Sequence, residues 1–185
     1  MQHILRQHIE KIIPLTNDEF VFVASLFTLK QYAKKDFLIT KGEGVKYVYF
    51  VVSGLLKLVY HDEAGNEHIV AFAMEDWWES DYYAFYNRGK ATMSLQCLED
   101  TAVFCITLND YQKLCEGLPK IEHFLLVKGN NGHIAGQQRI LSLLALTAKE
   151  RYEHFMRRYP SLTQRVPKTL IASYLGVSPE TLSRL

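Results

Sequence analysis

The hydrophobic period of this chain changes once, and that change limits what the chain can fold into. From about residue 31 to residue 106, short runs rich in Val, Ile, Tyr and Phe alternate with turn residues, whereas apolar residues recur at helical spacing from Leu108 onwards. Short strands joined by tight turns predict an antiparallel sandwich or roll. We therefore expect an α+β fold, with an N-terminal, jelly-roll-like antiparallel β-roll, flanking helices and a long central helix.

Turn and cap signals place the individual elements. Residues 3–32 begin with helical spacing, and Thr16 with Glu19 forms a capping box for a second short helix. The hairpin across residues 62–67 is the clearest turn, because its Gly and Asn both tolerate a positive φ. The expected strands carry DFLIT, YVYFVVSG, LLKLVYH, HIVAFAM, TMSLQCL and AVFCIT, and DWWESDYYAFYNRGK is expected to be a loop with one helical turn.

The long helical region carries a seven-residue repeat in which all members but Asn131, Gln138 and Tyr152 are strictly apolar. One register is Val127, Ile134, Leu141, Ala148 and Phe155, and the other is Phe124, Asn131, Gln138, Ala145 and Tyr152. A helix this long has too little partner surface in one small domain, so pairing with a twofold-related copy is its natural use. The alternative is packing on its own roll, which applies most to the N-terminal half. The assigned dimer-helix residues are Phe124, Val127, Ile134, Leu141 and Ala145.

The C-terminal segment VPKTLIASYLGVSPETLSRL predicts a helix-turn-helix. Pro160 ends the long helix, and a second short helix starts at Ser178, where an N-cap, a proline at the first helical position and an acid in the first turn coincide. The second helix of such a unit lies in the major groove of DNA. The assigned DNA-binding residues are Lys168, Thr169, Ser178, Glu180, Thr181, Ser183 and Arg184, the first two for phosphate. An ordinary helical hairpin is the alternative.

Charge and composition fit such an arrangement. Residues 149–185 hold 7 Lys/Arg and 3 Asp/Glu, whereas residues 1–148 hold 14 and 17, so a mildly acidic body carries a basic end. The chain has three cysteines, which form no CxxC pair and lie in apolar or helical segments. We therefore expect them to be small buried hydrophobic residues rather than members of a disulfide, a metal site or a redox site. With neither a signal peptide nor a membrane span, a cytoplasmic location is expected.

Three segments resemble the Crp/Fnr superfamily of bacterial regulators. ASYLGVSPETLSR is similar to its helix-turn-helix signature, TAKERYEHFMRRYPSL to the end of its long helix, and YVYFVVSGLLKL to its β-roll. The resemblance implies a homodimeric, sequence-specific DNA-binding transcription regulator. Its domains would be a cyclic-nucleotide-binding-like effector domain at 1–117, a dimerisation helix at 118–158 and a winged-helix-type helix-turn-helix at 159–185. Because family members usually extend the recognition helix and add a wing, this last domain is expected to be truncated at Leu185.

The same resemblance implies partners. A pseudo-palindromic DNA site, a second copy of the chain, RNA polymerase and an unidentified small-molecule effector are expected, and a membrane is not. Glu180, Thr181 and Arg184 occupy the recognition-helix positions that contact bases in family members. Effector binding would change the angle at a hinge across residues 157–161.

The nucleotide pocket departs from the family pattern. Family members that bind cyclic nucleotide carry a Gly-Glu pair and an Arg-Ser or Arg-Thr pair, and these positions fall here at Glu79-Ser80 and Met93-Ser94. A cyclic phosphate needs a bidentate cation, while this loop supplies acids that would repel it. The assigned effector-pocket residues are Glu79, Ser80, Asp81, Arg88, Lys90, Met93 and Ser94, of which Arg88 and Lys90 could compensate. A different ligand, or none, is therefore favoured over cyclic AMP.

Two readings compete with a regulator. A metal-dependent enzyme on the roll would need several His and a carboxylate close together, whereas His61 and His68 flank a turn without an HxH pattern. No Ser/His/Asp set or phosphate-binding loop appears either, so no catalytic residue, metal or firm cofactor is assigned. The other reading is a ligand-sensing or protein-interaction module that has lost DNA binding. The loop aromatics Trp77, Trp78, Tyr82, Tyr83, Phe85 and Tyr86 are expected to pack the loop onto the roll and the long helix, with a site for another small molecule as the alternative.

Overall fold

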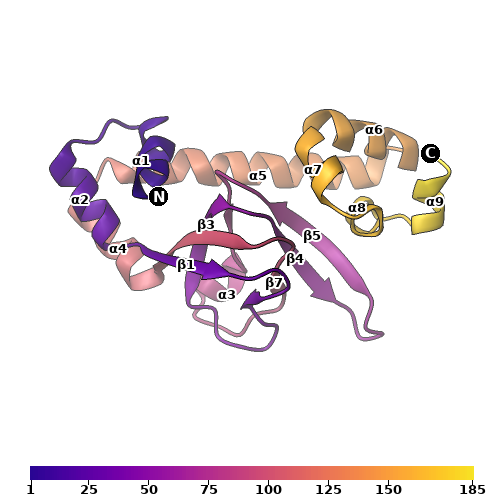
Figure 1. Cartoon of the computed structure of the whole chain (residues 1–185), viewed down its shortest axis with the longest axis horizontal. Coiled ribbons are helices and arrows are strands. Elements are labelled where there is room, and N and C mark those ends of the chain that lie inside the picture. The colour runs from indigo at the N-terminus through magenta and orange to yellow at the C-terminus, as the bar shows by residue number, and fades with distance from the viewer.

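The computed structural model describes residues 1–185 and places a β-roll against one long helix (Figure 1). In chain order the elements are α1 (Gln2–Glu10), α2 (Asn17–Ser25), β1 (Thr28–Tyr32), β2 (Phe37–Ile39), β3 (Tyr47–Ser53), β4 (Leu56–His61), β5 (Glu67–Ala73), β6 (Trp78–Glu79), α3 (Tyr82–Tyr86), β7 (Ser94–Cys97), β8 (Thr101–Thr107), α4 (Leu108–Gly117), α5 (Ile121–Ala145), α6 (Ala148–Arg158), α7 (Pro160–Arg165), α8 (Lys168–Leu175) and α9 (Pro179–Ser183). The expected α+β class is confirmed. None of these helices is both long and apolar enough to cross a membrane.

The roll consists of two four-stranded antiparallel sheets. Their strand orders are β1-β8-β3-β6 and β2-β7-β4-β5, so β4 and β5 form a hairpin while every other pair of consecutive strands lies in different sheets. All six segments expected as strands form β2, β3, β4, β5, β7 and β8. The β4–β5 hairpin turns at Gly65, whose φ of 85° requires a residue without a side chain.

Two strands lie where the sequence predicted other structure. Residues 28–32, expected in the helical N-terminal region, form β1, which pairs with β8 from Thr28 opposite Cys105 to Tyr32 opposite Thr101. In the loop expected to be irregular, Trp78 and Glu79 pair with β3 as β6 before the single helical turn that becomes α3. In both cases pairing with a strand distant in sequence overrides a weak local pattern.

The helical region is not one helix. Pro119 separates α4 from α5, and the chain leaves helical geometry again at Leu146, which has φ −102° and ψ 147°. Thr147 then caps α6 through a capping box, since its hydroxyl accepts from the Glu150 N–H and the Glu150 carboxylate accepts from the Thr147 N–H. The seven-residue registers therefore stop at Ala145, and the continuation to Ala148 and Phe155 was wrong. The glycines of α5 do not interrupt it.

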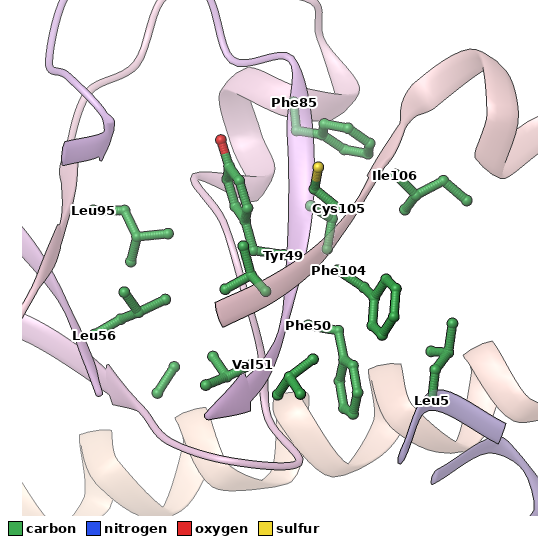
Figure 2. Close-up of a cluster of buried hydrophobic side chains, with 14 of the residues drawn as sticks. Leu5, Tyr49, Phe50, Val51, Leu56, Phe85, Leu95, Phe104, Cys105 and Ile106 are labelled. Atoms are coloured by element: carbon green, nitrogen blue, oxygen red, sulfur yellow. The ribbon is translucent and has the colours of Figure 1, made fainter. Parts of the chain in front are cut away.

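The main hydrophobic core fills the roll and reaches the helices beside it. Figure 2 shows that successive β3 residues point in different directions, with Tyr49 beside Cys105 and Phe85, and Phe50 toward Leu5 of α1. Phe124 of α5 and Leu5 are both buried in the same core. Because the inward faces of both sheets carry large side chains, the interior of the roll is filled by the protein itself.

A buried histidine stabilises the contact between α1 and the roll. His8 is only 1% exposed, its ring lies 4.4 Å from that of Phe50, and its Nε2 accepts a hydrogen bond of 2.9 Å from the Trp78 indole N–H. Its Nδ1 therefore carries the proton and donates to Asp76 at 3.1 Å, and Asp76 also pairs with Lys11. Burial, aided by the nearby positive charge of Lys128, lowers the pKa of His8 to about 4, so the ring is neutral at physiological pH.

A second hydrophobic cluster joins the last four helices to the outer face of the roll. It contains Leu55, Val59, Ile69 and Phe72 from the β4–β5 region together with Phe155, Leu162, Val166, Ile171, Ala172, Leu175 and Leu182. Figure 1 shows α6 to α9 gathered at one end of α5, while α1 and α2 lie at the other end. We call residues 148–185 the helix-turn-helix unit, because α6 packs with α7, α8 and α9.

Candidate nucleic-acid interface and effector region

The local structure of the helix-turn-helix follows from its glycine and its cap. Gly176 ends α8 with φ 66° and ψ 39°, a left-handed conformation that favours glycine, and the Val177 N–H donates to the Ala172 carbonyl at 3.0 Å. Ser178 then caps α9 by accepting from the Thr181 N–H, with Pro179 at the first helical position. The start of the second helix at Ser178 agrees with the sequence prediction.

All seven residues assigned to DNA binding are exposed: Lys168, Thr169, Ser178, Glu180, Thr181, Ser183 and Arg184. Leu182 alone is buried on α9, so the rest of that short helix faces solvent. The hydroxyl of Ser178 is already used in capping, which makes it a positioning group for Thr181 rather than a free donor. Hydrogen bonds from its own backbone and from Ser178 hold the pKa of Glu180 below its ordinary value, so its carboxylate is ionised.

Three polar side chains tie the helix-turn-helix unit to the rest of the chain. Arg165 at the end of α7 pairs with Glu99 at 2.7 Å and with Glu75 at 2.8 Å, and also donates to the Gly54 carbonyl. Gly54 has φ 100° and lies against Thr101, so a Cβ there would clash. These contacts were not predicted, because nothing local in the sequence marks Arg165 as different from any other arginine.

Arg139 and Ser173 make the other two connections. Arg139 of α5 donates to the carbonyls of Tyr174 and Ile69, each at 2.9 Å, and its guanidinium lies 3.8 Å from the centre of the Tyr174 ring. Ser173 accepts from the Ile69 N–H and donates to the Glu67 carbonyl, both on β5, the last strand of its sheet. The helix α8 therefore lies directly on the roll.

The expected hinge across residues 157–161 is well packed in this structure. Tyr159 stacks edge-on against Phe155 and Trp77, at ring separations of 5.7 and 5.6 Å. The helix break at Leu146 and Thr147 lies before the helix-turn-helix unit and carries no comparable aromatic contacts. Bending there would move α6 to α9 as one body.

Most residues assigned to the effector pocket make hydrogen bonds within the protein. Asp81 caps α3 and accepts hydrogen bonds from the Ala84, Thr92 and Met93 N–H groups, the last two across the loop. Although burial acts to raise it, these bonds hold the pKa of Asp81 below its ordinary value. The carboxylate is therefore committed to closing the loop of residues 82–93.

The other assigned pocket residues are engaged in the same way. Ser80 donates to the Tyr47 carbonyl, Ser94 accepts from the Lys41 N–H, and Arg88 donates to Asn109. Lys90 bridges to Gly44 through its backbone. Burial raises the pKa of Glu79 to about 7, and its main partner is the adjacent Ser80 N–H. No lysine or arginine contributes to the pKa of this carboxyl, while Arg88 and Lys46 line a separate hollow beside α3.

The loop aromatics divide into two groups. Trp77, Trp78 and Phe85 pack against the protein as expected. Tyr82, Tyr83 and Tyr86 are instead 41%, 72% and 51% exposed. The packing expectation was therefore wrong for Tyr82 and Tyr83, whereas Tyr86 still contacts Phe85 and Tyr111 edge-on. They occupy α3, whose inward side is already filled by Ala84 and Phe85.

The long helix α5 presents an apolar surface. Ile134, Leu141 and Leu144 are 52%, 57% and 81% exposed, and Ala145 is exposed as well. Val127 is half-buried, whereas Phe124 is fully buried in the roll core and offers no surface to a partner. The N-terminal part of α5 thus packs on its own roll, and the apolar surface belongs to its C-terminal part.

The cysteine and metal expectations can be placed on the structure. All three cysteines are free, and Cys97 and Cys105 are buried. Burial raises the pKa of Cys97 to about 11, which makes its thiol unreactive at physiological pH. No group of three or more His, Cys, Asp or Glu side chains is arranged to hold a metal ion.

Comparisons with known proteins agree with this architecture. The cyclic nucleotide-binding domain family matches residues 29–117. Regulatory protein HlyX of Actinobacillus pleuropneumoniae is 27% identical over 173 residues, covering 84% of this chain and 69% of that protein. Transcriptional activator protein Anr of Pseudomonas protegens is 29% identical over 163 residues, covering 82% of this chain and 66% of that protein.

A solved structure shows the same fold over most of the chain. FixK2 from Bradyrhizobium japonicum superposes with a TM-score of 0.73 at 20% identity, covering 85% of this chain and 81% of that one. The chain spans about two thirds of the length of the curated relatives described above.

Proposed function

We propose that the chain is a homodimeric, sequence-specific DNA-binding transcription regulator of the Crp/Fnr type, because it matches the cyclic nucleotide-binding domain family and resembles the regulatory protein HlyX and, in its fold, FixK2. The observation that carries this proposal is α9, a short helix with a fixed start at Ser178 and one buried residue, Leu182. Its exposed polar side chains match what a major-groove recognition helix requires. The relatives are regulators and not enzymes, in agreement with the expectation that the chain is not an enzyme.

The recognition helix divides its contacts between bases and phosphates. Arg184 can donate to guanine O6 and N7, and the ionised Glu180 can accept from a cytosine amino group. Lys168 at the start of α8 carries a positive charge suited to backbone phosphate. In a dimer, two such helices would enter successive major grooves about 34 Å apart.

A DNA-binding selection from a random duplex pool tests the proposal. We expect enrichment of a pseudo-palindromic site whose binding weakens with salt. Arg184→Ala should cost about 1 to 3 kcal/mol and relax specificity at one base pair of each half-site. Arg157→Ala, on an exposed side chain outside α9, is the matched control. Failure of the chain to enrich any site would favour the ligand-sensing or protein-interaction module instead.

The dimer interface is proposed for the C-terminal part of α5. Ile134, Leu141 and Leu144 leave apolar area in water that a second copy would bury. We expect Leu141→Glu to convert the dimer to a monomer in size-exclusion chromatography with light scattering, since an unpaired charge would enter the seam. Val21→Glu, on a side chain 68% exposed in α2, is the control and should leave the mass unchanged.

The roll is proposed to sense a ligand other than cyclic AMP, or to act without a ligand. Asp81, Ser80 and Ser94 already have protein partners, and Glu79 would repel a phosphate when ionised. Titration calorimetry with cyclic AMP should therefore show no saturable heat. Saturable binding that also changes DNA affinity would contradict this part of the proposal.

A further inference from the structure

A cavity lined by positive charge lies where α5, α6 and α8 meet. Its lining residues include three arginines and one histidine, and none is Asp or Glu. The polar side chains that define it are Gln138, Arg139, Arg151, His154, Arg158 and Tyr174, and Phe155 and Leu175 close its apolar side. The cavity thus joins the central helix to the helix-turn-helix unit.

The positive charge of this cavity is not neutralised by the protein. Arg139, Arg151 and Arg158 form no ion pair within 4.0 Å, in contrast to Arg165, which pairs with two glutamates. Arg139 donates to two backbone carbonyls, and Arg158 donates to the Tyr159 hydroxyl. Gathering three guanidinium groups without a counter-charge costs free energy that a bound anion would offset.

One hydrogen-bond donor in the cavity wall is left without a partner. Arg151 donates through Nη1 to the Leu146 carbonyl at 2.7 Å, but its buried Nε has no hydrogen-bond acceptor. It is the only buried side-chain nitrogen or oxygen of the whole chain in that condition. Buried donors in native proteins are nearly always satisfied by protein, water or ligand.

We propose that this cavity binds a small phosphate-type oxyanion, held by Arg151 and Arg158, with Arg139 adding a third positive charge to the lining. The space open to water-sized molecules is about 40 Å³, room for roughly three waters and therefore for a tetrahedral oxyanion. The planar guanidinium offers paired donors that suit phosphate oxygens. The cavity walls belong to helices on both sides of the Leu146 break, so a bound anion would favour the observed position of the helix-turn-helix unit.

This regulatory consequence rests on the proposed function, but binding itself does not. An anion that fixes α6 and α8 against α5 would shift the equilibrium between this arrangement and any other that the unit adopts on DNA. The coupling is reciprocal, so DNA affinity and anion affinity must change together. The binding step can be measured on the protein without DNA.

The test is a titration of the full chain with inorganic phosphate against chloride at constant ionic strength. Thermal unfolding should shift upward saturably with phosphate, and in ¹H–¹⁵N spectra the amides of α6 and α8 should move with the same affinity. Arg151→Gln and Arg158→Gln should each weaken phosphate binding about tenfold or more. Arg157→Gln, on the same helix outside the cavity, should bind phosphate within twofold of the unmodified chain.

Each outcome decides the proposal. Equal phosphate affinity in all variants, or equal shifts with chloride, would show binding elsewhere on the surface and overturn it. Circular dichroism separates loss of binding from loss of fold, and Arg158, an exposed residue, supplies a variant with little structural risk. If free phosphate does not bind but both cavity variants weaken binding to all DNA duplexes equally, the cavity contacts DNA backbone and the proposal is wrong.

Discussion

The two hydrophobic clusters of this chain are built differently. The first contains 29 buried residues from both sheets and from the helices next to them, and it is enclosed on all sides. The second contains 11, of which four belong to the roll, so the helix-turn-helix unit contributes only seven. Seven buried residues are too few for an independent core. The first cluster therefore determines the fold, whereas the second is an interface.

Polar contacts also differ between the roll and the second cluster. Within the roll, buried polar groups close loops, as Asp81 does for residues 82–93. At the second cluster they bridge elements far apart in sequence, as Arg165 does between α7 and the roll. Interfaces between domains are more polar than cores and separate more easily. We therefore expect the contact between the helix-turn-helix unit and the roll to open at a lower free energy than the roll core unfolds.

The largest expected effect is at Phe50, in the centre of the first cluster. Phe50→Ala removes a fully buried ring between α1, β6 and α5 and should cost about 3 to 5 kcal/mol of unfolding free energy. Urea unfolding followed by circular dichroism measures this cost. We expect a single cooperative transition whose urea midpoint falls. Loss of structure in the helix-turn-helix unit alone would contradict the conclusion that the first cluster determines the fold.

Phe155→Ala makes the matching change in the second cluster. Phe155 is 2% exposed and packs against Tyr159 and Tyr174. The cost should be about 2 to 3 kcal/mol, smaller than at Phe50, because the unit can separate from the roll instead of unfolding the chain. Hydrogen exchange should show faster exchange in α8 and α9 with unchanged protection in β3 and β8. Uniform loss of protection would mean that the two clusters unfold together.

Arg165→Gln removes the ion pairs that hold α7 to the roll. The side chains of its partners Glu75 and Glu99 are 43% and 35% exposed, so the loss should be about 2 kcal/mol or below, after allowance for solvent screening. Hydrogen exchange in α8 should rise, as with Phe155→Ala but less. Lys168→Gln, an exposed cation without an ion pair, serves as the control. An identical response in both variants would mean that net charge rather than pairing is responsible.

The smallest expected effect, taken per pH unit, is the pH dependence of the first cluster. The His8 pKa is lowered from 6.5 to about 4, so the unfolded chain binds this proton at higher pH than the folded chain. The free energy of unfolding should therefore fall as pH drops from 6.5 towards 4, by at most about 1.4 kcal/mol per pH unit. In His8→Gln, which keeps a donor and an acceptor, this slope should be shallower. An unchanged slope would assign the pH dependence to other groups.

The sequence predicted the roll better than the helices. The segments of β3, β4 and β8 are mostly apolar runs that are buried at nearly every position, and turn residues separate them, so the local pattern locates these strands. β1 escaped prediction because its residues are mostly polar and exposed, and pairing with β8 alone makes it a strand. The break before α6 could have been found, since Thr147 and Glu150 form a capping-box pattern in the sequence.

The candidate nucleic-acid interface could be predicted from the sequence only where the signal is local. Caps are local, so Ser178, Pro179 and Glu180 identified the start of α9 correctly. The contacts of Arg139 and Arg165 depend on where α5 and α7 meet the roll, and a single sequence contains no local signal for that. The buried position of Phe124 was likewise decided by tertiary packing and not by its register in the heptad pattern.

The position of Ser173 has one more consequence. Its hydroxyl accepts a hydrogen bond from the Ile69 N–H and donates one to the Glu67 carbonyl, and both residues belong to β5, the outermost strand of its sheet. When the helix-turn-helix unit moves away, this strand edge opens to any other strand that can pair with it, and unprotected edges are sites of aggregation. Any form in which the unit has left the roll would therefore have to cover β5 in another way or be short-lived.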